Sequence, residues 1–169
     1  LGADLVIIGV GILPAAELAE AAGLPCDNGI VVDEGCRTAD PRVLAVGDCT
    51  SHPNPLLGRR LRLESVHNAQ EQAKTAAGTI VGKPEPYAQI PWFWSDQYDL
   101  KLQIVGFSGR GEQAVVRGDP ESRSFAVFFL AGGRLTACYA VNSPREFMAS
   151  KKLVAAGARP DPAALADTT

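Results

Sequence analysis

The sequence predicts an α/β half followed by an α+β half. In the first 83 residues, short and wholly apolar runs such as 5–8 and 43–46 are typical of strands buried on both faces of a parallel sheet. The second half carries longer strand-like runs, two of them joined by a Gly132-Gly133 turn that predicts a hairpin. A stiff Lys-Pro-Glu-Pro connector at 83–86 separates the two styles, so we expect two domains.

The first half can be read element by element. In chain order it predicts a strand at 3–9, a helix at 15–22, strands at 29–33 and 43–46, a loop at 51–60 and a helix at 65–81. The loop is expected because Pro53, Asn54 and Pro55 all favour turns. The last helix is expected because apolar residues recur every three or four positions after Ser65, a suitable N-cap, and because Gly82 can end it.

In the second half, both tryptophans fall in a Pro-Trp-Phe-Trp segment at 91–94. The strands expected after it lie at 100–106, 113–117, 124–130 and 135–141. A helix at 144–156 follows, with Ser143 as N-cap, proline at the first helical position and Gly157 as its stop. An antiparallel sheet with one helix is therefore the expected second domain.

Composition excludes several classes of protein. The formal charge is −3 and the sequence pI near 5.4, which argues against nucleic-acid binding. No apolar run is long enough to cross a bilayer, so no membrane contact is expected. The four cysteines are far apart and lack the paired spacing of a zinc site, so we expect free thiols, no metal and a cytoplasmic location. The chain opens without Met, and we expect it to be part of a longer protein.

Three segments could bind a ligand. Gly9 and Gly11 follow a predicted strand, but Pro14 replaces the third glycine of a dinucleotide fingerprint, so a structural turn is the competing interpretation. Gly47 and Asp48 end another strand, where a carboxylate can accept bonds from hydroxyls or simply form a turn. The exposed amides at the start of the Ser65 helix suit an electron-rich oxygen.

Other polar and aromatic residues have plainer interpretations as well. Trp94 can be an aromatic wall for a planar cofactor or a core anchor. The Arg59-Arg60-Arg62 cluster is typical of a solvated loop face, and we assign His67 no catalytic role.

Four stretches, in this order, resemble the FAD-dependent, NADH-using ferredoxin reductases of the putidaredoxin reductase and biphenyl dioxygenase reductase type. They are Gly-Val-Gly-Ile-Leu-Pro at 9–14, Thr-Ala-Asp-Pro-Arg-Val-Leu-Ala-Val-Gly-Asp at 38–48, Glu-Ser-Val-His-Asn-Ala-Gln-Glu-Gln-Ala-Lys at 64–74 and Pro-Trp-Phe-Trp-Ser-Asp-Gln-Tyr at 91–98. The resemblance implies that residues 1–11 end an NADH domain, 12–83 form the returning half of a Rossmann-like FAD-binding domain, and 84–169 form an α+β C-terminal reductase domain.

The resemblance also implies roles for individual residues. With Gly47 beside it, Asp48 would hydrogen-bond the ribitol of FAD. Val66, behind the Ser65 cap, would offer its amide to the flavin pyrimidine edge, and Trp94 would lie against the isoalloxazine on the ferredoxin side. In addition, Gly9, Gly11 and Glu64 would line the path of NADH.

The implied whole protein is an oxidoreductase that passes electrons from NADH through FAD to a [2Fe–2S] ferredoxin, with no side chain acting as general acid or base. We expect this chain alone to be inactive, to lose FAD, and either to self-associate or to rearrange locally near residues 1–60. Two alternatives stay open. The chain could be a non-catalytic docking or dimerisation module, or it could belong to a flavin reductase branch with another electron acceptor.

Overall fold

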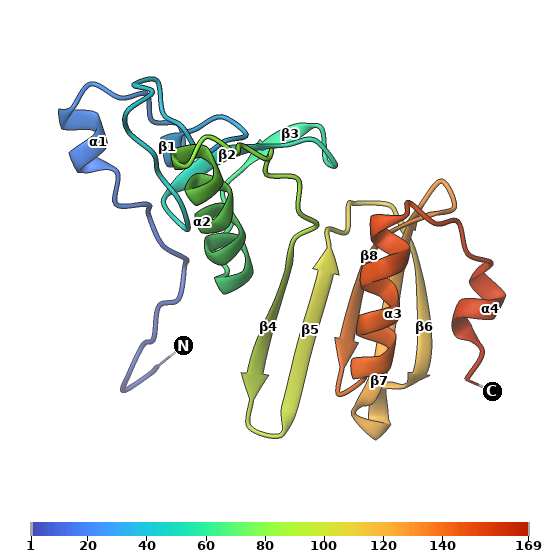
Figure 1. Cartoon of the computed structure of the whole chain (residues 1–169). Helices are drawn as coiled ribbons and strands as arrows, with labels where there is room; N and C mark the ends of the chain where they lie inside the picture. Colours follow the sequence, from blue (N-terminus) through green and yellow to red (C-terminus); the bar gives the residue numbers. More distant parts are fainter. Residues whose placement is uncertain (1, 169) are drawn as a thin grey trace. The chain divides into compact units, whose positions relative to one another are not determined.

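Figure 1 shows the computed structural model of the chain, which describes residues 2–168. It divides into two compact units. The N-terminal unit comprises residues 2–64 and 72–87, and the C-terminal unit comprises residues 65–71 and 88–168. The finer domain limits expected after residues 11 and 83 stay a prediction.

The N-terminal unit holds a small mixed sheet. Its elements are α1 (Glu17–Ala21), β1 (Ile30–Val31), β2 (Thr50–Asn54), β3 (Arg59–Leu61) and the later turns of α2 (Val66–Ile80). Strand β1 pairs in parallel with the start of β2, and β3 pairs antiparallel with its end. The parallel pair and the helix confirm the α/β class predicted for this half.

Two of the expected strands are wrong. Residues 5–8 form no strand, and Leu5 and Ile7 are 78% and 87% exposed. Residues 43–46 form only one isolated bridge, between Leu44 and Arg37. An apolar β-branched run becomes a strand only where another segment pairs with its backbone groups over several residues. The run at 5–8 has no such neighbour among the described residues, and the run at 43–46 pairs only with residues 36–38.

The loop expected at 51–60 is wrong as well, because it contains most of β2 and the start of β3. Strand β1 pairs with β2 only at Thr50 and Ser51. From His52 onward β2 therefore has one neighbour, and Pro53 sits where its missing N–H is tolerated.

Helix α2 begins and ends as predicted. The Ser65 hydroxyl accepts a hydrogen bond from the Asn68 amide at 3.1 Å. At the other end Gly82 has a φ of +73°, and the Lys83 amide donates to the Gly78 carbonyl at 2.8 Å. Both are common capping arrangements, so the two end signals were sufficient.

The buried face of α2 differs from the expected one. Val66 and Ile80 are 52% and 72% exposed, whereas Gln72 and Thr79 are buried. These polar side chains are hydrogen-bonded where they are buried: Thr79 Oγ1, for example, donates to the Gly35 carbonyl at 2.9 Å. Burial of a polar group costs little once its partner is supplied, so apolar spacing alone misassigned the face.

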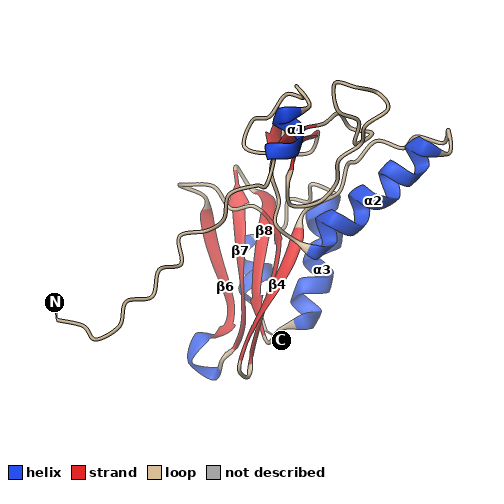
Figure 2. Ribbon diagram, turned by 90° about the vertical axis from the view of Figure 1, so that its left-hand side faces the viewer, coloured by secondary structure: helices blue, strands red, loops and turns tan. Residues whose placement is uncertain are grey.

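The C-terminal unit is an antiparallel sheet with helices packed on it (Figure 2). Its strands are β4 (Trp92–Gln97), β5 (Leu100–Gly106), β6 (Gln113–Asp119), β7 (Ser124–Ala131) and β8 (Arg134–Val141), in the spatial order β4-β5-β8-β7-β6. Helix α3 (Pro144–Ala155) packs on β8 and β5, and the short α4 (Pro162–Ala166) packs on β6. A 3-10 turn, η1 (Pro120–Ser122), joins β6 to β7.

The α+β class and all four expected strands are confirmed, while β4 and α4 were not foreseen. The core lies between the sheet and α3, with Phe128, Leu130, Leu135 and Phe147 each at most 4% exposed. None of the helices described between residues 2 and 168 has the length and apolar character needed to cross a bilayer.

Candidate functional site

The turn that carries Asp48 is held on both sides by buried hydrogen bonds. Gly47, at a φ of +86°, donates its amide to Gln72 Oε1 at 2.6 Å. Its carbonyl accepts from the amide and the hydroxyl of Thr50, at 3.0 and 2.8 Å. Asp48 itself is exposed. A fixed backbone therefore presents a carboxylate that solvent or a ligand can reach.

Arg62 connects the same turn to Glu64. Its side chain is 11% exposed, and Nη1 lies 2.7 Å from Glu64 Oε1 and 3.4 Å from the Asp48 carbonyl oxygen. Nε donates to Asn28 Oδ1 at 3.1 Å. Arg60 likewise donates to the Ser51 carbonyl at 2.6 Å. The interpretation of these arginines as a solvated loop face is therefore wrong for Arg62, whereas Arg60 is exposed but lies in strand β3 rather than in a loop.

The first turn of α2 presents the positive end of the helix. The Ser65 hydroxyl accepts a hydrogen bond from the Asn68 amide, and the first turn carries no acidic side chain. Val66 follows the cap and is 52% exposed. The positive end of the helix dipole favours an electron-rich oxygen at this point.

An aromatic stack in the C-terminal unit links this turn to Trp94. The His67 ring lies 5.2 Å from the Trp92 ring, and Trp92 lies 5.7 Å from both Trp94 and Phe147. Lys151 Nζ lies 4.4 Å above the Trp92 ring. Trp94 remains 40% exposed. Trp92 thus fixes the position of an aromatic side chain that is still open to a ligand.

The predicted site residues fall into three groups. Ser65, Val66 and Trp94 lie in the C-terminal unit, and Gly47, Asp48 and Glu64 lie in the N-terminal unit. Gly9 and Gly11 lie in the exposed segment before α1, and a Cβ atom built on either would meet nothing within 4 Å. Their role on the NADH path stays a prediction.

Sequence reasoning missed the supporting roles of Gln72, Arg62 and Trp92, which contact Gly47, Glu64 and Trp94 respectively. Gln72 has a signal in hindsight, since it is a polar residue that falls between the alanines of a helix. Arg62 and Trp92 are recognisable only from the folded chain, because their partners are up to 55 positions away, as with Trp92 and Phe147.

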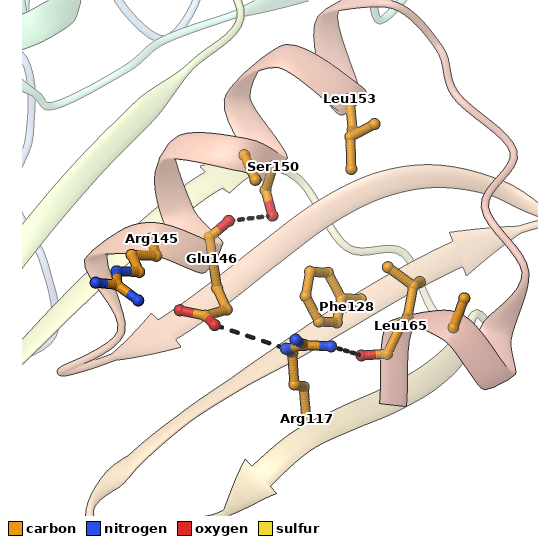
Figure 3. A pocket seen from close by; sticks show the side chains of 9 residues that line it. Arg117, Phe128, Arg145, Glu146, Ser150, Leu153 and Leu165 are labelled. Atoms are coloured by element: carbon orange, nitrogen blue, oxygen red, sulfur yellow. Dashed lines mark hydrogen bonds and ion pairs between the residues drawn. The ribbon is translucent and has the colours of Figure 1, made fainter. Parts of the chain in front are cut away.

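A cavity of about 260 Å³ lies between α3, α4 and the sheet (Figure 3). Phe128, Leu153 and Leu165 line its apolar part. At its charged side, Arg117 Nε lies 3.6 Å from Glu146 Oε1, and Nη1 donates to the Leu165 carbonyl at 3.3 Å. No predicted site residue lines it, so it is separate from the candidate site.

Two of the four cysteines, Cys36 and Cys138, are buried. Within residues 2–168, no group of three or more His, Cys, Asp or Glu side chains is placed to hold a metal ion. Burial, reinforced by Asp33, raises the pKa of Cys36 to about 11, and burial raises the pKa of Cys138 to about 11. Both are therefore thiols at neutral pH, the form that is a poor nucleophile.

Comparison with known proteins shows which families the two parts of the chain resemble. Residues 1–73 match the family described as pyridine nucleotide-disulphide oxidoreductase, and residues 92–169 match the reductase C-terminal family. Together these matches cover most of the chain. The first part of the chain is therefore similar to an oxidoreductase family, and the second part to the C-terminal domain of reductases.

Individual relatives are similar to this chain along nearly its whole length. The chain is 54% identical over 168 residues to the ferredoxin–NAD(+) reductase component of the anthranilate 1,2-dioxygenase system of Burkholderia cepacia, covering 99% of this chain and 41% of that protein. Among solved structures, the ferredoxin reductase for the CYP199A2 system of Rhodopseudomonas palustris is 41% identical with a TM-score of 0.92, covering 98% of this chain and 41% of that one. The covalent putidaredoxin reductase–putidaredoxin complex is 45% identical with a TM-score of 0.90, covering 99% and 40%.

The chain is therefore similar to ferredoxin reductases along almost its whole length, and the resemblance stated from its motifs is confirmed. It spans about two fifths of the length of the relatives it matches.

Proposed function

We propose that the full-length protein passes electrons from NADH through FAD to a [2Fe–2S] ferredoxin. The observation that carries this proposal is similarity over 99% of the chain to a ferredoxin–NAD(+) reductase component. The putidaredoxin reductase relative is known in a covalent complex with putidaredoxin, which supports a small iron–sulfur protein as the partner.

The N-terminal unit contributes the Asp48 turn to FAD binding. Asp48 accepts hydrogen bonds from the ribitol hydroxyls, and Gln72 and Thr50 keep its turn in place through Gly47. The fit to a flavin is supported by the glycine itself, which has no Cβ and a φ of +86° that few other residues adopt. Charge-assisted bonds of this kind are the stronger ones in proteins.

The C-terminal unit contributes a dipole and an aromatic surface. The Val66 amide donates to the pyrimidine edge of the flavin, and the positive end of α2 stabilises negative charge there. Trp94 would lie against the flavin ring on the ferredoxin side. Its own ring is positioned by Trp92, with the two ring centroids 5.7 Å apart. FAD supplies the redox chemistry when bound, accepting two electrons from NADH and releasing them singly.

The nicotinamide side is assigned to Glu64, Gly9 and Gly11. Arg62 holds Glu64 at 2.7 Å, which keeps this carboxylate in one position beside the α2 cap. No general acid or base is required of this chain, since its residues bind, orient and shield.

The experiment is reconstitution of the full-length protein. Purified protein should show flavin absorbance and should reduce a [2Fe–2S] ferredoxin such as putidaredoxin with NADH. Colourless protein that binds no FAD would favour a docking module without redox activity. Flavin reduction that reaches other small acceptors but no ferredoxin would favour another reductase branch.

We also place the protein in a reducing cytoplasm. All four cysteines, which lie within the described residues, are free. Free thiols persist in reducing compartments, so the cysteine state supports this location. Fractionation of the source cells with an antibody tests it.

A further inference from the structure

The turn between β4 and β5 exposes a tyrosine in an unusual conformation. Gln97 pairs with Leu100, so only Tyr98 and Asp99 form the turn. Tyr98 has a φ of +56° and an exposed fraction of 105%. Two-residue hairpin turns with positive φ favour Asn, Asp and Gly, and a bulky residue there is an outlier. The tyrosine therefore gains neither burial nor favourable backbone geometry from its position.

The turn is nevertheless held firmly from two other loops. Asn142 Nδ2 donates to the carbonyls of Asp99 and Arg123 at 3.2 and 3.0 Å, and its Oδ1 accepts from the Lys101 amide at 2.9 Å. Arg123 Nη2 lies 2.7 Å from Asp99 Oδ1. Arg123 and Asn142 also have positive φ values, of +60° and +47°. Three left-handed residues from three loops thus meet at one end of the sheet, and strain that is held in this way is characteristic of functional sites.

Tyr98 lies on the same strand-and-turn segment as Trp94. Tyr98 is four positions after Trp94, which is about 13 Å at the usual rise of a strand. A specific interface covers about 800 Å² per partner, a patch of roughly 16 Å radius. A protein that docks over Trp94 therefore also reaches Tyr98. Tyrosine is one of the residues that most often anchor such interfaces.

We propose that Tyr98 is a docking anchor for the ferredoxin, held out from the surface by the Asn142 network. This inference rests on the proposed function, because Trp94 marks the surface that the ferredoxin must approach. The Asn142 network fixes the backbone of the turn before the partner arrives, which reduces the backbone entropy lost on binding.

The test is Tyr98→Asn in the full-length, FAD-loaded protein. Asparagine suits the left-handed turn, so the melting temperature should be equal to or higher than that of the wild type. The KM for a [2Fe–2S] ferredoxin that the wild type reduces should rise about fivefold to tenfold, the size typical of losing an interface anchor. Reduction of ferricyanide with NADH should not change, because it needs no protein docking.

Two control variants separate docking from folding. Tyr98→Phe keeps the ring and should retain most of the ferredoxin affinity. Val116→Asn removes an exposed apolar side chain, 45% exposed, from β6 at the other edge of the same sheet, and should leave the KM unchanged.

The outcomes are distinct. An unchanged ferredoxin KM in Tyr98→Asn overturns the inference, while wild-type activity with ferredoxin upholds the proposed function. A variant that loses a dimer in light scattering at unchanged KM assigns Tyr98 to a second copy of this protein instead. A wild type that reduces ferricyanide but no ferredoxin overturns the proposed function, and the docking role with it.

Discussion

Replacing Gln72 with leucine should weaken FAD binding although Gln72 does not touch the cofactor. Its Oε1 accepts the Gly47 amide at 2.6 Å inside the N-terminal unit. Leucine has nearly the same size and no acceptor, so the Gly47 N–H is left buried without a partner. The turn that presents Asp48 must then either stay strained or move toward water.

The expected loss of FAD affinity follows from the hydrogen bonds of the Gln72 side-chain amide. A buried donor without a partner costs about 1–3 kcal/mol. The Thr50 hydroxyl also loses Gln72 Oε1 as an acceptor, but its single hydrogen can still be donated to the Gly47 carbonyl at 2.8 Å. This loss therefore adds little to the cost. Gln72 Nε2 has no partner among the described residues, so its loss adds nothing. If the unpaired Gly47 amide costs about 2 kcal/mol, the FAD dissociation constant should rise by a factor of roughly 30.

The assay is titration of full-length apoprotein with FAD, followed by flavin fluorescence. Gln70→Leu is the matched control, because Gln70 is exposed on the same helix and the chemical change is identical. Gln72→Glu retains an acceptor oxygen and should bind FAD more tightly than Gln72→Leu at mildly acid pH, where the buried carboxyl is neutral. If Gln72→Leu binds FAD as tightly as Gln70→Leu, Gln72 does not hold the turn.

The remaining predictions concern the other site residues and the isolated chain. Trp94→Ala in the full-length protein should slow electron delivery to ferredoxin more than flavin reduction by NADH, and equal losses in stopped-flow traces would contradict its role. Asp48→Ala should weaken FAD retention without unfolding the apoprotein, at about 1.5–3 kcal/mol for each charge-assisted bond lost; unchanged flavin content after dialysis would reject the assignment. The 169-residue chain alone should keep a folded C-terminal unit, self-associate through its exposed apolar segment at 5–13, and lose FAD, since about 4–6 kcal/mol from its own contacts gives only millimolar to tens-of-micromolar affinity. Absorbance and size-exclusion with light scattering test this, and a yellow, monomeric sample that oxidises NADH would refute it.

The sequence predicted the C-terminal sheet well because its signals are local. Alternation along 124–130 and 135–141, the Gly132-Gly133 turn and the Ser143-Pro144 helix start each depend on a few neighbouring residues. β7, β8 and α3 accordingly lie where expected. Strand β4 was missed because its burial does not alternate: both Phe93 and Trp94 are exposed.

The N-terminal unit was harder to predict because its strands depend on distant pairing. The run at 5–8 has strong strand propensity but no partner, whereas Pro53 lies in a strand despite its poor propensity. The same distinction holds for the candidate site. Asp48 and Trp94 could be proposed from motifs, while the role of Gln72 becomes clear only from its contact with Gly47, 25 positions away.

Strand β4 has one hydrogen-bonding neighbour, β5, within the described chain. Its other side presents backbone N–H and C=O groups along a strand that is rich in aromatic side chains. Such an edge is a template for pairing with stray polypeptide during synthesis and storage. Two residues oppose this: Pro91 precedes the strand, and Asp96, 3.8 Å from Lys101, places a charge within it. Neutralising Asp96 should therefore reduce the soluble yield before it alters any catalytic constant. The residues that prevent pairing at this edge thus matter as much for handling the protein as those that bind its ligands.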